Sequence, residues 1–180
     1  MAEGTSLKKE PLLKLKYLSH STLETRDLER SRRFYEEFLG LDVVRTSPVS
    51  LMIRLGGNHT IAVVHNPRKP EMRRGNHNGL DVETRAEVDH CYKLVMENKD
   101  SWELKSVIAP RDAHGTYSFY FVDFDDNWWE ILTNPEGGYS WMFGKGRDID
   151  SWGAGEEQGF NPNDFTRRLP PGKKTTHSAE

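Results

Sequence analysis

The chain of 180 residues lacks several features that mark specialised classes of protein. Its one cysteine, Cys91, cannot form an intrachain disulfide and fits a reducing compartment. Basic residues are not in excess, because 25 Lys and Arg stand against 28 Asp and Glu, which argues against a nucleic-acid-binding module. No apolar run reaches the length of a membrane span, and residues 1–30 lack the pattern of a signal peptide. We therefore expect a cytoplasmic globular protein that binds neither nucleic acid nor membrane.

Apolar residues are also scarce, at 35% of the chain, and the deficit lies at the C-terminus. Residues 136–180 hold 11 apolar side chains in 45 positions. We expect a polar C-terminal extension that is partly disordered, from about Arg167 onward. Its six aromatic residues indicate that part of it docks on the body or on a partner subunit. Residues 1–14 are typical of a leader, which leaves a body over residues 15–135.

The body contains an internal repeat. The segment from His20 aligns with the segment from His77 at an offset of 57 residues, and this places Asp27 over Thr84. Both of these are favourable helix N-caps. Each predicted helix follows one strand-like segment and precedes three more. The first half has strand-like segments at 15–25, 41–45, 51–55 and 60–65, and the second at 76–83, 102–108, 117–122 and 128–133.

This order predicts an α+β fold built from two βαβββ modules, over about residues 15–67 and 76–135. A single module would leave one sheet face exposed, so we expect the two modules to share one core.

Three polar residues, His20, His77 and Glu130, form a candidate metal site. The two histidines occupy equivalent places on the first strands of the two halves. Glu130 stands in an otherwise apolar strand, where burial of a carboxylate without a partner is costly. A metal ion would be such a partner. Two histidines and one carboxylate on one face are the ligand set of non-haem Fe(II) sites, which keep open positions for substrate and O₂.

These residues lie in segments that resemble the vicinal-oxygen-chelate superfamily. That superfamily includes glyoxalase I, fosfomycin-resistance proteins, methylmalonyl-CoA epimerase and type I extradiol dioxygenases. The segments are DLERSRRFYEEFLGLDVV, RLGGNHTIAVV, GNHNGLDVE and FYFVDFDDNWWEIL, and the last is similar to the extradiol signature. The resemblance implies an open, cup-shaped mixed β-barrel around a metal held by His20, His77 and Glu130. Fe(II) is the favoured metal, with Mn(II) or Zn(II) as alternatives.

Two further positions bear on which branch of the superfamily fits. Alignment of the Asn-Pro ends of the two halves puts Ala62 opposite Glu130, where the glyoxalase and epimerase branches carry a fourth ligand. Alanine cannot bind a metal, which favours the three-ligand branches, and His65 would need a change of register to substitute. Tyr120 should pair with Glu130 across a hairpin centred on Asp125, where its phenol could hydrogen-bond a bound diol.

Two more histidines are candidates by resemblance. His114 lies upstream of the Phe-Tyr pair, where extradiol enzymes carry a histidine that stabilises the substrate, although an exposed loop histidine would explain it equally well. His59 lies where dioxygenase-like sequences often carry histidine, and a polar residue at a strand edge is the competing interpretation. With His65, it is a candidate for substrate binding.

The sequence thus predicts an Fe(II)-dependent extradiol dioxygenase that cleaves a catechol-like aromatic diol with O₂. One alternative is another metal-dependent enzyme of the superfamily, such as a thiol transferase, lyase or isomerase. A phosphonate substrate would need several cations near the metal, which the sequence does not identify. A binding module without catalysis is the third alternative. Association into a homodimer or larger homo-oligomer stays open.

Overall fold

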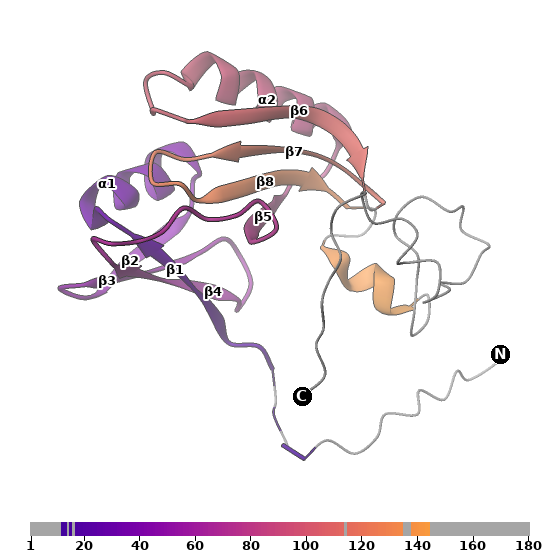
Figure 1. Cartoon of the computed structure of the whole chain (residues 1–180). Coiled ribbons are helices and arrows are strands. Elements are labelled where there is room, and N and C mark those ends of the chain that lie inside the picture. The colour runs from indigo at the N-terminus through magenta and orange to yellow at the C-terminus, as the bar shows by residue number, and fades with distance from the viewer. Residues whose placement is uncertain (1–11, 14, 16, 114, 135–137, 145–180) are drawn as a thin grey trace, which may run out of the picture.

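The computed structural model describes residues 12–13, 15, 17–113, 115–134 and 138–144 (Figure 1). The first half contains β1 (His20–Thr25), α1 (Leu28–Arg33), η1 (Phe34–Phe38), β2 (Asp42–Ser47), β3 (Ser50–Arg54) and β4 (Thr60–His65). The second half contains β5 (His77–Asp81), α2 (Arg85–Asn98), β6 (Ser106–Ala113), β7 (Thr116–Val122) and β8 (Trp128–Thr133), and η2 (Tyr139–Gly144) follows. No helix among these residues is long and apolar enough to cross a membrane.

Each half forms its own four-stranded mixed sheet. The strand orders are β1-β4-β3-β2 and β5-β8-β7-β6, with the first strand of each half parallel to the last. This confirms the predicted pair of βαβββ modules. The two sheets do not close into a barrel, and an open cup is compatible with their arrangement.

The repeat is visible in the register of the two sheets. Thr22 pairs with Ala62 in the first sheet, and Gly79 pairs with Glu130 in the second. His20 and His77 stand two residues earlier on the corresponding strands. The structure therefore confirms that the two histidines are equivalent and that Ala62 occupies the place of Glu130.

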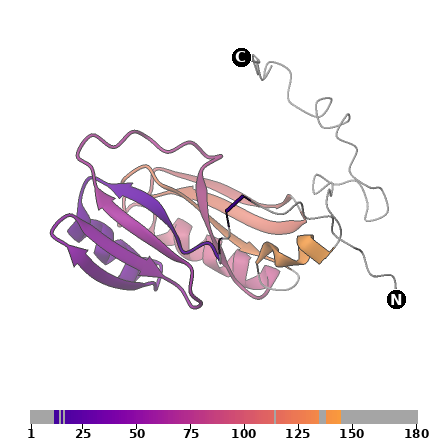
Figure 2. The same ribbon diagram turned by 90° about the horizontal axis from the view of Figure 1, so that it is seen from below.

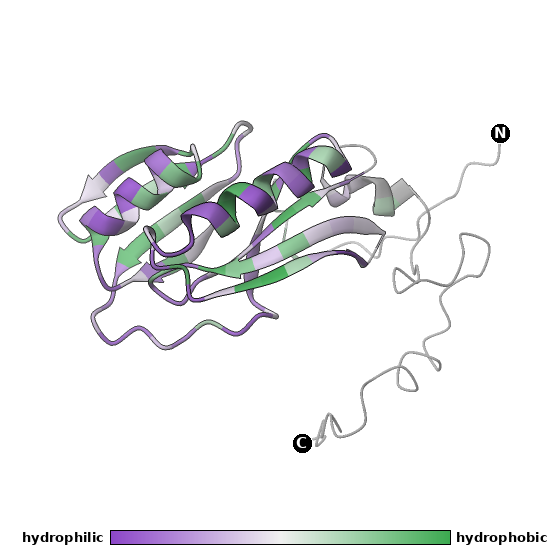
Figure 3. Cartoon of the chain, turned by 90° about the horizontal axis from the view of Figure 1, so that it is seen from above, coloured by the Kyte–Doolittle hydropathy of each residue, from purple (hydrophilic) through white to green (hydrophobic). Residues whose placement is uncertain are grey.

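Both modules contribute to one core, as predicted. Figure 3 shows α1 and α2 in front of the sheets, and Figure 2 shows the strands from the opposite side, so both helices cover the same side. The ring of Phe34 lies 6.4 Å from that of Trp129, and the ring of Phe38 lies 6.1 Å from that of Phe121. Aromatic side chains of the first helix thus pack against the second sheet and fix one module on the other.

The helix caps follow the sequence, whereas the end of the first helix does not. Asp27 accepts a hydrogen bond from the Arg30 amide at 3.0 Å, and Thr84 forms a complete capping box at α2. After α1 the turns widen, since the amide of Leu39 bonds to the carbonyl of Phe34, five residues back. This wider turn keeps Phe34 and Tyr35, the first two residues of η1, buried, and no periodicity in the sequence predicts it.

Two predicted strands begin later than expected. Of the predicted strand 15–25, only His20–Thr25 pairs with a neighbour. The strand predicted at 102–108 begins at Ser106, because residues 101–103 form a turn in which Glu103 has a φ of 53°. The Leu104 amide then bonds back to the Lys99 carbonyl at 2.9 Å. That turn directs the Trp102 ring toward the first module, 5.9 Å from the Phe34 ring.

A charged network ties the second hairpin to the first module. The Arg26 guanidinium donates to Asp125 at 2.8 Å and to Asp126 at 3.0 Å, and the Arg26 amide donates to Asp125 at 2.9 Å. The Lys69 ammonium, 5% exposed as a residue, donates to the Asp125 carbonyl at 2.8 Å. Because these groups come from three separate segments, they hold the β7–β8 turn in place.

Candidate metal centre

Two of the predicted metal ligands face each other on the second sheet. His77 opens the edge strand β5, and Glu130 lies at the middle of the neighbouring β8. The His77 Nε2 atom lies 3.1 Å from Oε2 of Glu130. Glu130 is 3% exposed, whereas the His77 side chain is 30% exposed. The buried Glu130 carboxylate is therefore partly open on one side, where the His77 imidazole lies.

The hydrogen bonds of His77 make this pair suitable for a cation. Its Nδ1 lies 2.7 Å from the carbonyl oxygen of Arg74, which can only accept, so Nδ1 carries a proton. In the neutral imidazole, Nε2 then presents a lone pair to the Glu130 carboxylate. The lone pair and the carboxylate repel each other unless a proton or a metal cation lies between them. A backbone carbonyl on one histidine nitrogen is also the usual way in which a metal-binding histidine is oriented.

Without a metal, the same contact perturbs both groups. The hydrogen bond to Glu130 raises the pKa of His77, against the opposing effect of partial burial. Burial acts to raise the pKa of Glu130, but the hydrogen bond from His77, with smaller effects from Tyr120 and Ser118, lowers it overall. The contact therefore favours the charged form of each group, and a metal would take the place of the second imidazole proton.

Tyr120 lies beside the pair, and its predicted position opposite Glu130 is confirmed. The strand register places it directly opposite Glu130, and its ring stands edge-on to the His77 ring at 5.1 Å. Burial and the Glu130 carboxylate raise the pKa of the Tyr120 phenol well above its ordinary value, so the phenol stays protonated. Beside it, the hydroxyl of Ser118 is fully buried and acts on both the Tyr120 phenol and the Glu130 carboxylate. Ser118 thus adds a second hydroxyl to this face of the sheet.

His20 does not join the other two ligands within one chain. Among the described residues, no group of three or more histidine, cysteine, aspartate or glutamate side chains is close enough to hold a metal. His20 is exposed on β1, the edge strand of the first sheet, and its Nδ1 contacts Ser19 Oγ at 2.7 Å. The role of His20 therefore stays a prediction.

The remaining histidine candidates lie elsewhere or are not described. His59 is exposed in the loop before β4. His65 ends β4, where its Nε2 lies 3.2 Å from the backbone carbonyl oxygen of Arg26. Neither has an interaction with His77 or Glu130 in the part of the chain that the structure describes. His114 lies outside the described residues.

The structure also places groups that sequence reasoning missed. The Arg74 charge acts on His77 in addition to the carbonyl contact, and Arg111 pairs with Ser118, which puts it on the same sheet face as Tyr120. Arg74 thus acts on the site and Arg111 shares the sheet face of Tyr120, where the sequence had identified no cations. The alternation Ser118–Tyr120 along β7 could have revealed the serine, whereas Arg74 lies in a loop without any pattern.

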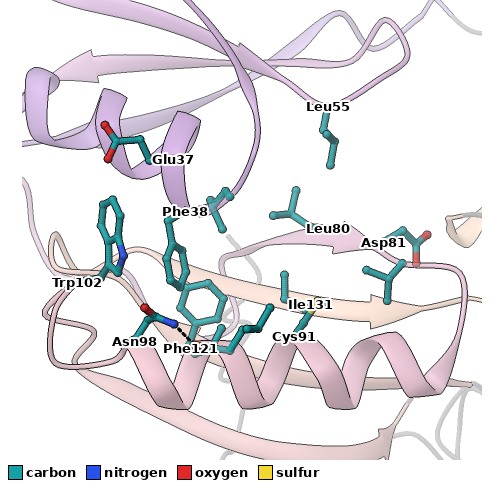
Figure 4. A pocket seen from close by; sticks show the side chains of 14 residues that line it. Glu37, Phe38, Leu55, Leu80, Asp81, Cys91, Asn98, Trp102, Phe121 and Ile131 are labelled. Carbon is teal, nitrogen blue, oxygen red and sulfur yellow. Dashed lines mark hydrogen bonds between the residues drawn. The ribbon is translucent and has the colours of Figure 1, made fainter.

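A separate cavity of about 370 Å³ lies on the opposite face of the second sheet (Figure 4). Leu80 and Ile131 point into it, together with Phe38, Trp102 and Cys91. Because successive residues of a strand face opposite sides, Ile131 faces this cavity and Glu130 faces away from it. Burial raises the pKa of the Cys91 thiol, which agrees with an unreactive cysteine.

The family model for the glyoxalase/bleomycin resistance protein/dioxygenase superfamily matches residues 17–131. The chain belongs to this superfamily. The match contains β1, both helices, and the strands that carry His77, Tyr120 and Glu130. The superfamily's description names glyoxalases and dioxygenases together, so membership alone does not specify the reaction.

Solved structures of superfamily proteins resemble this chain. A possible glyoxalase from Bacillus cereus is 19% identical, with a TM-score of 0.55, over 66% of this chain and 99% of its own. The fosfomycin resistance protein FosX from Mesorhizobium loti is 26% identical, with a TM-score of 0.53, over 72% and 98%. FosX from Listeria monocytogenes is 24% identical, with a TM-score of 0.53, over 68% and 96%. No curated protein matches the chain.

Proposed function

We propose that this superfamily member is a metal-dependent dioxygenase of the extradiol type, acting on a catechol-like diol. The observation that carries the proposal is the His77–Glu130 pair, in which an imidazole nitrogen and a buried carboxylate face each other beside a protonated phenol. A bound Fe(II), or Mn(II) in its place, would act as a Lewis acid with open positions for two diol oxygens and O₂. His77 and Glu130 would hold it.

The chain's own residues would bind and orient the diol. Tyr120 keeps its proton because its pKa is raised, so the phenol can donate a hydrogen bond to an anionic diol oxygen. Ser118 offers a second hydroxyl on the same face. In the overall reaction one ring C–C bond beside the diol breaks, and both atoms of O₂ enter the product, so no external reductant is needed.

We further propose that His20 of a second copy completes the metal site. Among the described residues, one chain brings His77 and Glu130 together, whereas its own His20 is exposed on a sheet edge. A two-fold symmetric dimer that brings β1 of each copy to the second sheet of the other would create two identical sites. The two-histidine, one-carboxylate set predicted from the sequence would then form between subunits.

The chemistry is tested by anaerobic loading with Fe(II), followed by O₂-electrode assays with a panel of catechols. We expect O₂ uptake and coloured ring-opened products, with loss of both metal and activity in His77→Ala and Glu130→Gln. Bound metal in the wild type without O₂ uptake on any diol would refute the dioxygenase. Unchanged metal content in His77→Ala would refute the site itself.

The shared site is tested by mixing two inactive variants, His20→Ala and His77→Ala. After unfolding and refolding together, half of the dimers are mixed, and each mixed dimer has one intact site of two. Activity should therefore return to about a quarter of the wild-type value. A site within one chain would give no recovery, because every chain then carries a defective ligand set.

Arg111 and Arg74 favour a second candidate, a metal-dependent reaction on a small anionic substrate. Their positive charges lie near the site, and the chain is 26% identical to a fosfomycin resistance protein. Loss of the epoxide of fosfomycin in the presence of Mn(II), followed by ³¹P NMR without O₂, tests this candidate. Turnover of fosfomycin without O₂ uptake on diols would replace the dioxygenase proposal.

A further inference from the structure

The short helix η2 lies beyond the part of the chain that the superfamily model matches. The match ends at residue 131, and η2 begins at Tyr139. Figure 1 draws η2 below the end of β8, whereas α2 lies above the sheet. The helix therefore lies on the side of the second sheet that carries Glu130, opposite the side covered by α2.

Asp81, the last residue of β5, anchors the start of this segment. One of its carboxylate oxygens accepts a hydrogen bond from the Gly138 amide at 2.5 Å. The Asn134 side-chain amide lies 3.2 and 3.1 Å from the two oxygens of the same carboxylate. Gly138 has a φ of 71°, which a residue with a side chain adopts only with strain. The chain thus turns sharply at an anchored glycine, directly before Tyr139.

The Tyr139 side chain lies on the sheet face that carries the candidate metal centre. Its phenol interacts with the hydroxyl of Thr116, a buried residue at the start of β7. Burial raises the pKa of the phenol, and the Glu130 and Asp81 carboxylates raise it further. Tyr139 in turn acts on Tyr120, which shares a face of β7 with Thr116. Tyr139 is 38% exposed, so it borders the site without sealing it.

We propose that Tyr139 is a specificity-determining wall of the site and that Asp81 is the positioning residue that seats it. The inference rests on the proposed function, because it concerns which diols that site accepts. Tyr139 closes the Thr116 end of the sheet face that carries Tyr120 and Glu130. The substrate class is accordingly a single-ring diol without a bulky substituent on the side that meets Tyr139.

The test compares catechol with 3-phenylcatechol in wild-type enzyme and in Tyr139→Ala, with Phe143→Ala as the matched control. Phe143 lies on the same helix but is 87% exposed. In Tyr139→Ala we expect the ratio of kcat/KM for 3-phenylcatechol to that for catechol to rise by about tenfold or more, mainly through KM. Tyr139→Phe, which keeps the ring, and Phe143→Ala should retain the wild-type ratio.

The positioning role is tested with Asp81→Ala and the conservative Asp81→Asn. Asp81→Ala should shift the ratio in the same direction as Tyr139→Ala, and Asp81→Asn should restore part of the preference because its oxygen can still accept from the Gly138 amide. If Asp81→Ala does not fold, Asp81→Asn alone should show a smaller shift in the same direction. Mn(II) affinity, measured by EPR, should be unchanged in all these variants, because none of them touches His77.

Binding of 4-nitrocatechol, followed by absorption without turnover, separates the possible failures. If the wild type binds Mn(II) and diols but Tyr139→Ala keeps the wild-type size preference, the inference about Tyr139 is refuted and the proposed function stands. If the ratio shifts in Tyr139→Ala but not in the Asp81 variants, the positioning role is refuted. If the wild type binds Mn(II) but no diol, the proposed function fails and the inference fails with it.

Discussion

Replacement of Asp123 by alanine should destabilise the hairpin that aligns Tyr120 with Glu130. Asp123 is 1% exposed and its carboxylate accepts four hydrogen bonds in the β7–β8 turn. Oδ1 accepts from the backbone amides of Asp125 at 2.8 Å and Asn127 at 2.9 Å. Oδ2 accepts from the Asn127 side-chain amide and from the Trp129 indole, both at 3.0 Å.

The size of the loss follows from these four donors. A buried donor left without an acceptor costs about 1–3 kcal/mol. Burial raises the pKa of Asp123 despite the four donors, so removal of the carboxylate also relieves a desolvated charge and offsets part of the loss. We expect Asp123→Ala to lower the free energy of unfolding by about 3–5 kcal/mol. Asp123→Asn keeps the Oδ1 contacts and should lose roughly half as much.

Urea unfolding followed by fluorescence measures these differences. The matched control is Asp112→Ala, because Asp112 is also paired, with Arg85, but its side chain is 70% exposed. Loss of this exposed surface pair should lower the free energy of unfolding far less than loss of Asp123. A loss below about 1 kcal/mol in Asp123→Ala, or equal losses in the alanine and asparagine variants, would refute the hydrogen-bond assignment.

Four further predictions concern other contacts. Because Glu130 raises the pKa of His77, protons should compete with metal at Nε2 already above the ordinary pKa of histidine. Metal affinity, measured by metal titration at several pH values, should fall about tenfold per pH unit below the raised pKa. An affinity that does not change with pH would contradict this. In metal-free protein, the His77–Glu130 pair should stabilise the fold most at pH values between the lowered pKa of Glu130 and the raised pKa of His77. The contribution of His77 is lost as pH rises through its raised pKa, and that of Glu130 is lost as pH falls through its lowered pKa. Thermal unfolding measured across pH tests this. Arg26→Ala leaves the buried Asp125 carboxylate without its cation and should cost about 2–3 kcal/mol in urea unfolding, whereas Arg26→Lys should recover part. Thr84→Ala removes the capping box of α2 and should cost about 1 kcal/mol, with Thr84→Ser nearly neutral.

The internal repeat was the most informative feature of the sequence, because each half of the chain predicts the strand order of the other half. The offset that aligned His20 with His77 is reproduced by the pairs Thr22–Ala62 and Gly79–Glu130 in the two sheets. The cluster of turn-forming residues at 123–127 likewise fixed the hairpin, and with it the pairing of Tyr120 with Glu130. Short-range patterns of this kind specify strands and turns through contacts between residues close in sequence.

Other features depend on contacts between distant segments, which no local pattern encodes. The wide turn at Phe34–Phe38 exists because aromatic rings of the first module pack on the second sheet. The Arg74 carbonyl that orients His77 lies in a loop, and Asp81 meets Gly138 across 57 residues. For the same reason, the sequence listed His20 beside His77 and Glu130, although one chain does not gather the three.

The sequence by itself determined the two modules, their strands, and the ligand-type side chains on equivalent strands, because alternation, caps and turn residues act locally. Only the tertiary structure decided which of those side chains meet. It brought His77, Glu130 and Tyr120 together, oriented the imidazole Nε2 toward the carboxylate, and left His20 on an exposed edge. The physical reason is that a site is formed by the register and packing of whole sheets, and these are set by the shared core rather than by any single segment.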